Sequence, residues 1–179
     1  MRLKNMLKTM QKDGIPEDAR NQFEHVVQTY RGGEADLRFV GKMDDLLTEQ
    51  QRLSIWERNG GCRLGGRNRE AVAFQLEHAD KTLAEKLELL KNTRFMGNFC
   101  LNEDGTVTAG NGCHLCVLKK LEPPYTASST VFGCSAGGAL YNYEIALGVK
   151  LRLKSIDSFL LDPEAGKPYS FTFEIVDET

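Results

Sequence analysis

The sequence lacks long apolar runs and a strong excess of charge of either sign. No apolar stretch approaches the roughly 18 residues that a membrane-spanning helix needs. Twenty-three Lys and Arg stand against 25 Asp and Glu, a net charge of −2, which argues against a protein dedicated to nucleic acids. Residues Met1 to Lys12 also lack the apolar segment of a signal peptide. We therefore expect a cytoplasmic protein that binds neither membranes nor nucleic acids.

Histidine and cysteine are scarce, with three His and five Cys among 179 residues. An odd number of cysteines does not suit a complete disulfide framework, and a chain of this length buries a core without one. In a reducing compartment, clustered cysteines more often bind metal or carry out thiol chemistry. The apolar fraction of 41% and the charged fraction of 27% are those of an ordinary globular protein, so we expect a single domain over residues 1–179.

Residues 1–91 form the half of the chain that we expect to be helical, because apolar residues recur there every three or four positions. The predicted helices are 16–30, 42–57 and 68–91. Pro16 suits the first turn of a helix. Arg31-Gly32-Gly33 and Asn59-Gly60-Gly61 are expected to end the first and second helices.

Residues 92–179 change to the period of two that is typical of half-buried strands. The expected strands are 95–101, 106–109, 117–121, 149–154 and 171–175. Asn102-Glu103-Asp104-Gly105 is a hairpin signal, and Ser135 and Gly148 are expected to cap a helix over 135–147. We therefore predict an α+β domain, in which N-terminal helices pack on a C-terminal, mainly antiparallel sheet with one inserted helix.

Cys113-His114-Leu115-Cys116 is the sharpest motif in the chain. Two cysteines separated by two residues can bind one tetrahedral ion. Cys134 follows 18 residues after Cys116, near the spacing between the two halves of many zinc sites. Cys100 is the nearest further thiol, since the hairpin can return it beside Cys113. We predict that zinc, or alternatively iron, is bound by Cys113, Cys116, Cys134 and Cys100.

The fourth ligand and the presence of metal remain open at this point. Cys62, His114 or a water can replace Cys100, and a site with one open position is typical of catalytic metals. Alternatively, the thiols are reduced and inert, some of them buried as small apolar side chains. A third interpretation is a redox pair of Cys113 and Cys116.

Cys134 comes immediately before the predicted helix 135–147, and this position suggests a nucleophile. A helix N-terminus carries partial positive charge, which lowers the pKa of a thiol. A cysteine hydrolase also needs a nearby base, and His114 is our candidate among the three histidines. Cys134 and His114 are therefore the candidate catalytic residues of a small-molecule C–N hydrolase, with a metal-bound water as the alternative attacking group.

Two further features bear on ligand binding. Residues 59–67 form a glycine-rich, basic loop, which can hold an anion on its amides, although a simple connection between helices is the favoured interpretation. Aromatic residues near the cysteines can line a small-molecule pocket between helices and sheet. Tyr141 and Tyr143 are expected to point to different sides of their helix.

The C-terminal half also resembles a known group of proteins. The resemblance rests on the turn Phe132-Gly133-Cys134-Ser135-Ala136-Gly137, on the helix end Leu147-Gly148 and on the strand 171–175. This pattern is similar to a Cys-containing family of small, mostly uncharacterised bacterial proteins. That family looks related to hydrocarbon-binding domains of the bacteriochlorophyll vinyl-reductase type and to aminothiazoline-carboxylate hydrolase-like proteins. The resemblance implies an α+β fold, a homodimer, and the sensing of a small molecule or metal.

Cys113, Cys116 and Cys134 match cysteine positions of that family. Phe132 stands where the family pattern has another cysteine, and an aromatic residue replaces a cysteine in the last strand. These departures argue against a closed four-thiolate zinc site. Our leading hypothesis is a domain that binds or senses a small molecule or metal; the alternatives are the hydrolase and a structural protein with inert thiols.

Overall fold

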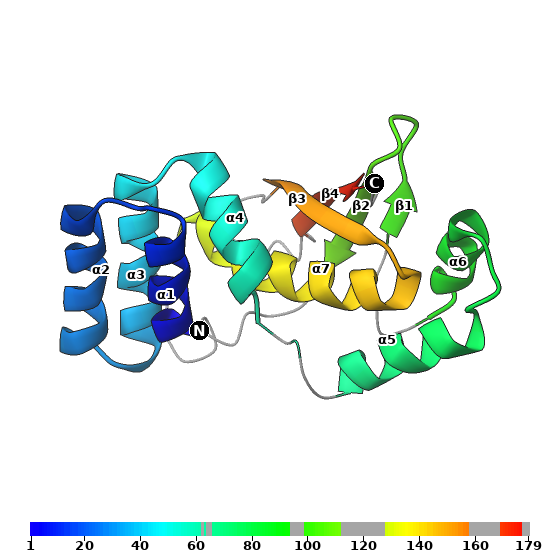
Figure 1. Cartoon of the computed structure of the whole chain (residues 1–179), viewed down its shortest axis with the longest axis horizontal. Coiled ribbons are helices and arrows are strands. Elements are labelled where there is room, and N and C mark those ends of the chain that lie inside the picture. Colours follow the sequence, from blue (N-terminus) through cyan, green and yellow to red (C-terminus); the bar gives the residue numbers. More distant parts are fainter. Residues whose placement is uncertain (62, 64–65, 94–98, 112–127, 158–168, 177–179) are drawn as a thin grey trace, which may run out of the picture.

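The computed structural model describes residues 1–61, 63, 66–93, 99–111, 128–157 and 169–176. Its elements are α1 (Leu3–Lys12), α2 (Glu17–Thr29), α3 (Gly32–Leu46), α4 (Glu49–Asn59), α5 (Gly66–Glu77), α6 (Leu83–Leu90), β1 (Phe99–Leu101), β2 (Val107–Asn111), the 3₁₀ turn η2 (Ser129–Phe132), α7 (Gly133–Leu147), β3 (Lys150–Asp157) and β4 (Tyr169–Val176). Helices fill the N-terminal half of the sequence. In the C-terminal half, α7 comes between β2 and β3 along the chain and lies against the sheet in space (Figure 1). The predicted α+β class is therefore confirmed.

The strands form a four-stranded antiparallel sheet in the order β1-β2-β4-β3. β1 and β2 are the predicted hairpin, and its turn closes where Gly105 adopts a φ of +79°. β4 pairs with β2 on one side and with β3 on the other, so the last strand of the chain lies inside the sheet. A register shift between Leu153 and Ser155 interrupts the β3–β4 ladder.

α7 packs across one face of this sheet and joins it to the helical half. Phe171 and Phe173 of β4 are fully buried, and the ring of Tyr143 in α7 lies 6.0 Å from that of Phe173. On its other sides α7 contacts α4 and α5. One cluster of buried side chains consequently runs from Met6 in α1 to β4, through both halves of the chain.

The second and third predicted helices are each two helices in the structure, because a capping box starts a new helix inside each. Thr48 accepts the N–H of Gln51 at its side-chain oxygen, and the Gln51 side chain accepts the Thr48 N–H. Thr82 and Glu85 make the same pair of bonds at the start of α6. Each box satisfies N–H groups at a helix start, so it favours a new helix over continuation of the old one.

Other boundaries also differ from the sequence prediction. Gly32 was expected to end a helix; α2 does end just before it, but Gly32, with a φ of +61°, also begins α3. The helix α1 was not predicted, and it buries Met6 and Met10. α7 begins at Gly133, not after Ser135, because η2 runs directly into it. The predicted strand 117–121 lies outside the described residues.

Candidate functional site

The structure tests the predicted cysteine site only in part. The described residues exclude Cys62, Cys113, His114 and Cys116. Within the part of the chain that is described, no group of three or more His, Cys, Asp or Glu side chains is placed to hold a metal ion. The metal site therefore remains a prediction from the sequence.

Cys100 lies in β1, where the register places it opposite Thr108. Thr108 pairs in turn with Thr172 of β4. Cys100 thus pairs within the hairpin, and its joining Cys134 at a metal remains a prediction from the sequence.

Cys134 is the second residue of α7 and is half-buried. It lies inside the first turn, a correction to the prediction that it precedes the helix. Its carbonyl oxygen accepts the N–H of Gly61 at 2.8 Å. A Cβ atom on Gly61 would lie 2.8 Å from the Cys134 sulfur, so the chain after α4 lies close against this thiol.

The two described histidines lie elsewhere. His25 is in α2, with its Nδ1 3.5 Å from a threonine hydroxyl one turn later in the same helix. His78 follows α5 three residues after Gln75, whose side chain lies against Gly148 at the C-terminal end of α7. Cys134 is at the opposite end of this helix, roughly 20 Å away at 1.5 Å per residue. The hydrolase hypothesis thus depends on a base from outside the described residues.

Asn59 ends α4, and Gly66 and Arg67 begin α5, so the glycine-rich segment 59–67 joins two helices, as its favoured interpretation predicted. A Cβ atom on Gly60 would lie 2.3 Å from the backbone carbon of Gly137 in α7, so this glycine permits a close contact between helices. Arg63 donates to the carbonyl oxygens of Glu57 and Gly60 at the end of α4. Its guanidinium also lies 5.1 Å from the centre of the Tyr141 ring. Arg63 is therefore engaged in capping α4 and in stacking.

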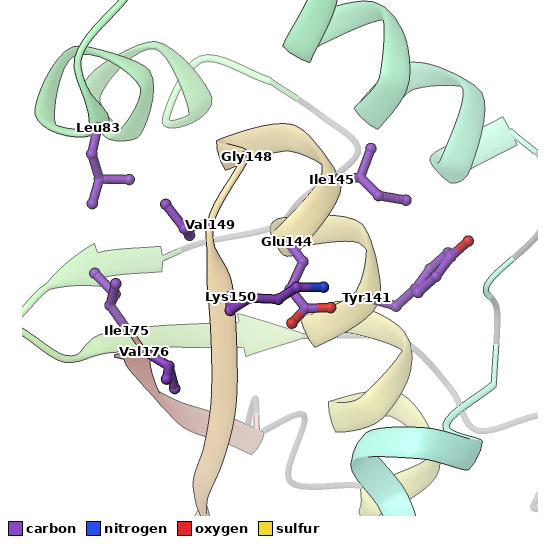
Figure 2. Close-up of a pocket in the computed structure, with 9 residues that line it drawn as sticks. All are labelled: Leu83, Tyr141, Glu144, Ile145, Gly148, Val149, Lys150, Ile175 and Val176. Carbon is purple, nitrogen blue, oxygen red and sulfur yellow. The ribbon is translucent and has the colours of Figure 1, made fainter. Parts of the chain in front are cut away.

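A cavity of about 440 Å³ lies between α6, the C-terminal part of α7 and the adjoining ends of β3 and β4 (Figure 2). Its aliphatic lining comes from Leu83, Ile145, Val149, Ile175 and Val176. Its other lining residues are Tyr141, Glu144, Gly148 and Lys150. In Figure 2, Leu83, Val149 and Ile175 lie to one side of β3, and Tyr141 lies on the other side, along α7. The cavity is thus mostly aliphatic, with a few polar groups.

The polar groups of the cavity have defined positions. Glu144 accepts the N–H of Leu151 at 3.1 Å through Oε1, so its carboxylate is directed toward β3.

The two tyrosines of α7 point to different sides of the helix. Tyr141 is half-exposed at the cavity, whereas Tyr143 is buried against the sheet. The predicted divergence of the two tyrosines is confirmed. Burial raises the pKa of the Tyr143 hydroxyl far above its usual value, so this residue stays neutral.

Glu57 of α4 is a polar residue that the sequence analysis did not single out. Its Oε1 accepts the N–H of Leu153 at 2.6 Å, beside the bond that Glu144 makes to Leu151. Burial raises the pKa of the Glu57 carboxyl, while the hydrogen bond from Leu153 and the charge of Arg152 oppose the shift. The two glutamates together occupy outward-facing N–H groups of the edge strand β3, which would otherwise be available to pair with another strand.

Of the cavity-lining residues, only Tyr141 belongs to the aromatic residues for which the sequence suggested a pocket between helices and sheet. In the sequence the others are ordinary positions of a helix, a strand or the turn between them, and Gly148 is the expected helix end. Comparison with protein-family models, with curated proteins and with solved structures found no match. None of the helices in the described ranges combines the length and apolarity needed to cross a membrane. A proposal about function therefore rests on the geometry of the cavity.

Proposed function

We propose that this chain binds a small, largely apolar molecule in the cavity between α6, α7 and the β3–β4 end of the sheet. The observation that carries the proposal is the convergence of aliphatic side chains from α6, α7, β4 and the residue before β3 on one cavity of about 440 Å³. Small-molecule sites usually have this character, with volumes of roughly 300–1,000 Å³ and a few polar groups that orient the ligand.

The lining supports binding more than catalysis. Leu83, Val149 and Ile175 are only half-buried, and a ligand that covers them removes further apolar surface from water, at about 25 cal/mol per Å². Glu144 is held by its hydrogen bond to the Leu151 amide, which suits a residue that orients a ligand. This proposal agrees with the small-molecule part of the hypothesis drawn from the sequence.

The test is a titration of six-carbon compounds followed in ¹H–¹⁵N spectra. Hexanol in the millimolar range is expected to shift the amide signals of Leu83, Val149 and Ile175. Val149→Asp, which places a charge on the cavity wall, is expected to abolish these shifts. Val72→Asp is the matched control, because Val72 is 42% exposed on α5 and does not line the cavity. Binding by Val149→Asp equal to that of the wild type would contradict the proposal.

Metal binding by the cysteines is the second candidate. The observation in its favour is that Cys134 lies in the first turn of α7, where the positive end of the helix dipole stabilises a thiolate. Anaerobically purified protein is expected to contain about one equivalent of zinc or iron, the number of ions a single site binds, and Cys113→Ser is expected to lose it. No metal together with five free thiols would remove this candidate. Sedimentation velocity on the same sample tests the homodimer that the family resemblance implies.

A further inference from the structure

Two opposite charges line the cavity without pairing with each other. Glu144 and Lys150 are the charged residues among the described side chains of the lining. No ion pair of the described residues includes either of them. A ligand with a single charge of either sign therefore leaves one of these two groups without a counterpart. A ligand that carries both charges matches the lining.

Glu144 offers one carboxylate oxygen to such a ligand. The residue is half-buried, and its Oε1 accepts the N–H of Leu151. Its Oε2 makes no hydrogen bond within the described part of the chain. The nearby guanidinium of Arg63 donates instead to carbonyl groups at the end of α4. Since an ionised carboxylate accepts at both oxygens, the ammonium group of a ligand can bind at Oε2.

Lys150 provides the positive charge, at the first position of β3. It is exposed, and Figure 2 shows its side chain running from β3 toward α7, the side on which the Glu144 carboxylate lies. An ammonium on a flexible stem can follow the carboxylate group of a bound ligand. Because water competes at an exposed position, this contact is expected to be weaker than the one at Glu144.

The aliphatic lining lies apart from these two charges. In Figure 2, Leu83, Val149 and Ile175 lie on one side of β3, and the two charged groups lie on the other side. Both sets of residues line the same cavity of about 440 Å³. A ligand that fills it is therefore charged at one end and aliphatic at the other.

We propose that the ligand of this cavity is an aliphatic α-amino acid. Its ammonium group binds Glu144 and its carboxylate binds Lys150. Its side chain covers Leu83, Val149 and Ile175. Both charged groups of an α-amino acid are attached to the same carbon atom, so they reach two neighbouring charges of the lining together. The inference rests on the proposed function and adds the chemical class of the ligand.

The experiment compares three compounds with the same aliphatic tail by titration of amide signals at pH 7. They are 2-aminohexanoate, hexanoate, which lacks the ammonium group, and pentylamine, which lacks the carboxylate. The amino acid is expected to bind about tenfold more tightly than hexanoate, the effect of one hydrogen bond to a charged group. It is expected to bind about threefold more tightly than pentylamine, because an ion pair with the exposed Lys150 is weak.

Two variants assign each preference to a residue. Glu144→Gln keeps an acceptor for the Leu151 N–H and removes the charge, so it is expected to abolish the preference over hexanoate. Lys150→Met is expected to abolish the preference over pentylamine. Glu174→Gln and Lys154→Met are the matched controls, because both residues are exposed on the sheet and do not line the cavity. Both controls are expected to keep the two preferences.

The outcomes separate the two proposals. Equal binding of the three compounds overturns the amino-acid inference and leaves the proposed function standing, whereas no binding of these compounds or of hexanol overturns both. Preferences that survive in Glu144→Gln and Lys150→Met, or that are lost equally in the controls, also overturn the inference. If Glu144→Gln does not fold, the ¹³Cδ signal of Glu144 in the wild-type protein decides. It is expected to shift with 2-aminohexanoate and pentylamine but not with hexanoate, and an equal response to all three overturns the inference.

Discussion

Gly137 of α7 lies against the backbone of Trp56 in α4: a Cβ atom on Gly137 would stand 2.0 Å from the Trp56 carbonyl oxygen. Trp56 is itself fully buried, and its ring lies where a side chain on Gly133 would be. Gly60 fits against Gly137 from the end of α4 in the same way. The contact between α4 and α7, which joins the helical half to the sheet, is therefore built on glycines.

Gly137→Ala is expected to lower the free energy of unfolding by about 1–3 kcal/mol or more, because the added methyl group meets backbone that cannot move aside. Gly41→Ala is the matched control in α3, where nothing lies within 4 Å of the added Cβ. It is expected to raise the free energy of unfolding by about 0.5–1 kcal/mol, the helix preference of Ala over Gly. Urea denaturation measures both, and equal effects of the two substitutions would contradict the close contact.

The capping boxes predict a second pair of stability changes. Thr82→Ala removes the acceptor for the Glu85 N–H at the start of α6, and it is expected to cost about 1 kcal/mol. Thr82→Ser keeps the acceptor and is expected to cost much less. Thr48→Ala should behave similarly at α4. Thermal unfolding by circular dichroism checks this prediction, which fails if Ala and Ser at position 82 are equivalent.

The pH dependence of stability is expected to reflect Glu57. Burial raises the pKa of its carboxyl in the folded protein, so the folded state binds the proton more tightly than the unfolded state. The ionised carboxylate is consequently unfavourable to folding above the folded-state pKa, and this effect disappears as the pH falls below about 4.

Glu57→Gln retains an acceptor for the Leu153 N–H and removes the charge. It is expected to be more stable than the wild type at pH 7, with the difference shrinking as the pH falls toward 4. Urea titrations at a series of pH values measure this difference. A Glu57→Gln variant that is less stable than the wild type at pH 7, or a difference that grows in acid, would show that the carboxylate is stabilising.

The edge of β3 yields a further prediction. Glu57 and Glu144 accept the N–H groups of Leu153 and Leu151, so the double substitution by Ala leaves two edge N–H groups open to another strand. The double variant is expected to self-associate, as measured by sedimentation velocity. Glu174→Ala is the control, because Glu174 is an exposed residue of β4 that pairs with Arg152 across the sheet. Unchanged sedimentation of the double variant would mean that the two glutamates do not protect this edge.

Much of the secondary structure could be predicted because its signals act over a few residues. The hairpin at residues 102–105 and the end of α7 at Gly148 follow from local turn chemistry. The division of the longer predicted helices had a local signal as well, in Thr48-x-x-Gln51 and Thr82-x-x-Glu85, but the continuous apolar periodicity across each box obscured it.

Apart from the aromatic residue Tyr141, the candidate site had no such signal. Leu83, Glu144, Val149 and Ile175 are ordinary residues of a helix, a strand or the turn between them, and they meet only when α6 and α7 dock at the end of the sheet. Lys86 belongs to an amphipathic helix in which a lysine is normally exposed, and its burial depends on the position of α7. The sequence by itself thus determined the α+β class and the approximate positions of most helices and strands, because propensities and caps are local. Only the tertiary structure decided which glycines allow helices to touch, which side chains line a cavity and which lysine is buried, because these depend on contacts between residues far apart in the chain.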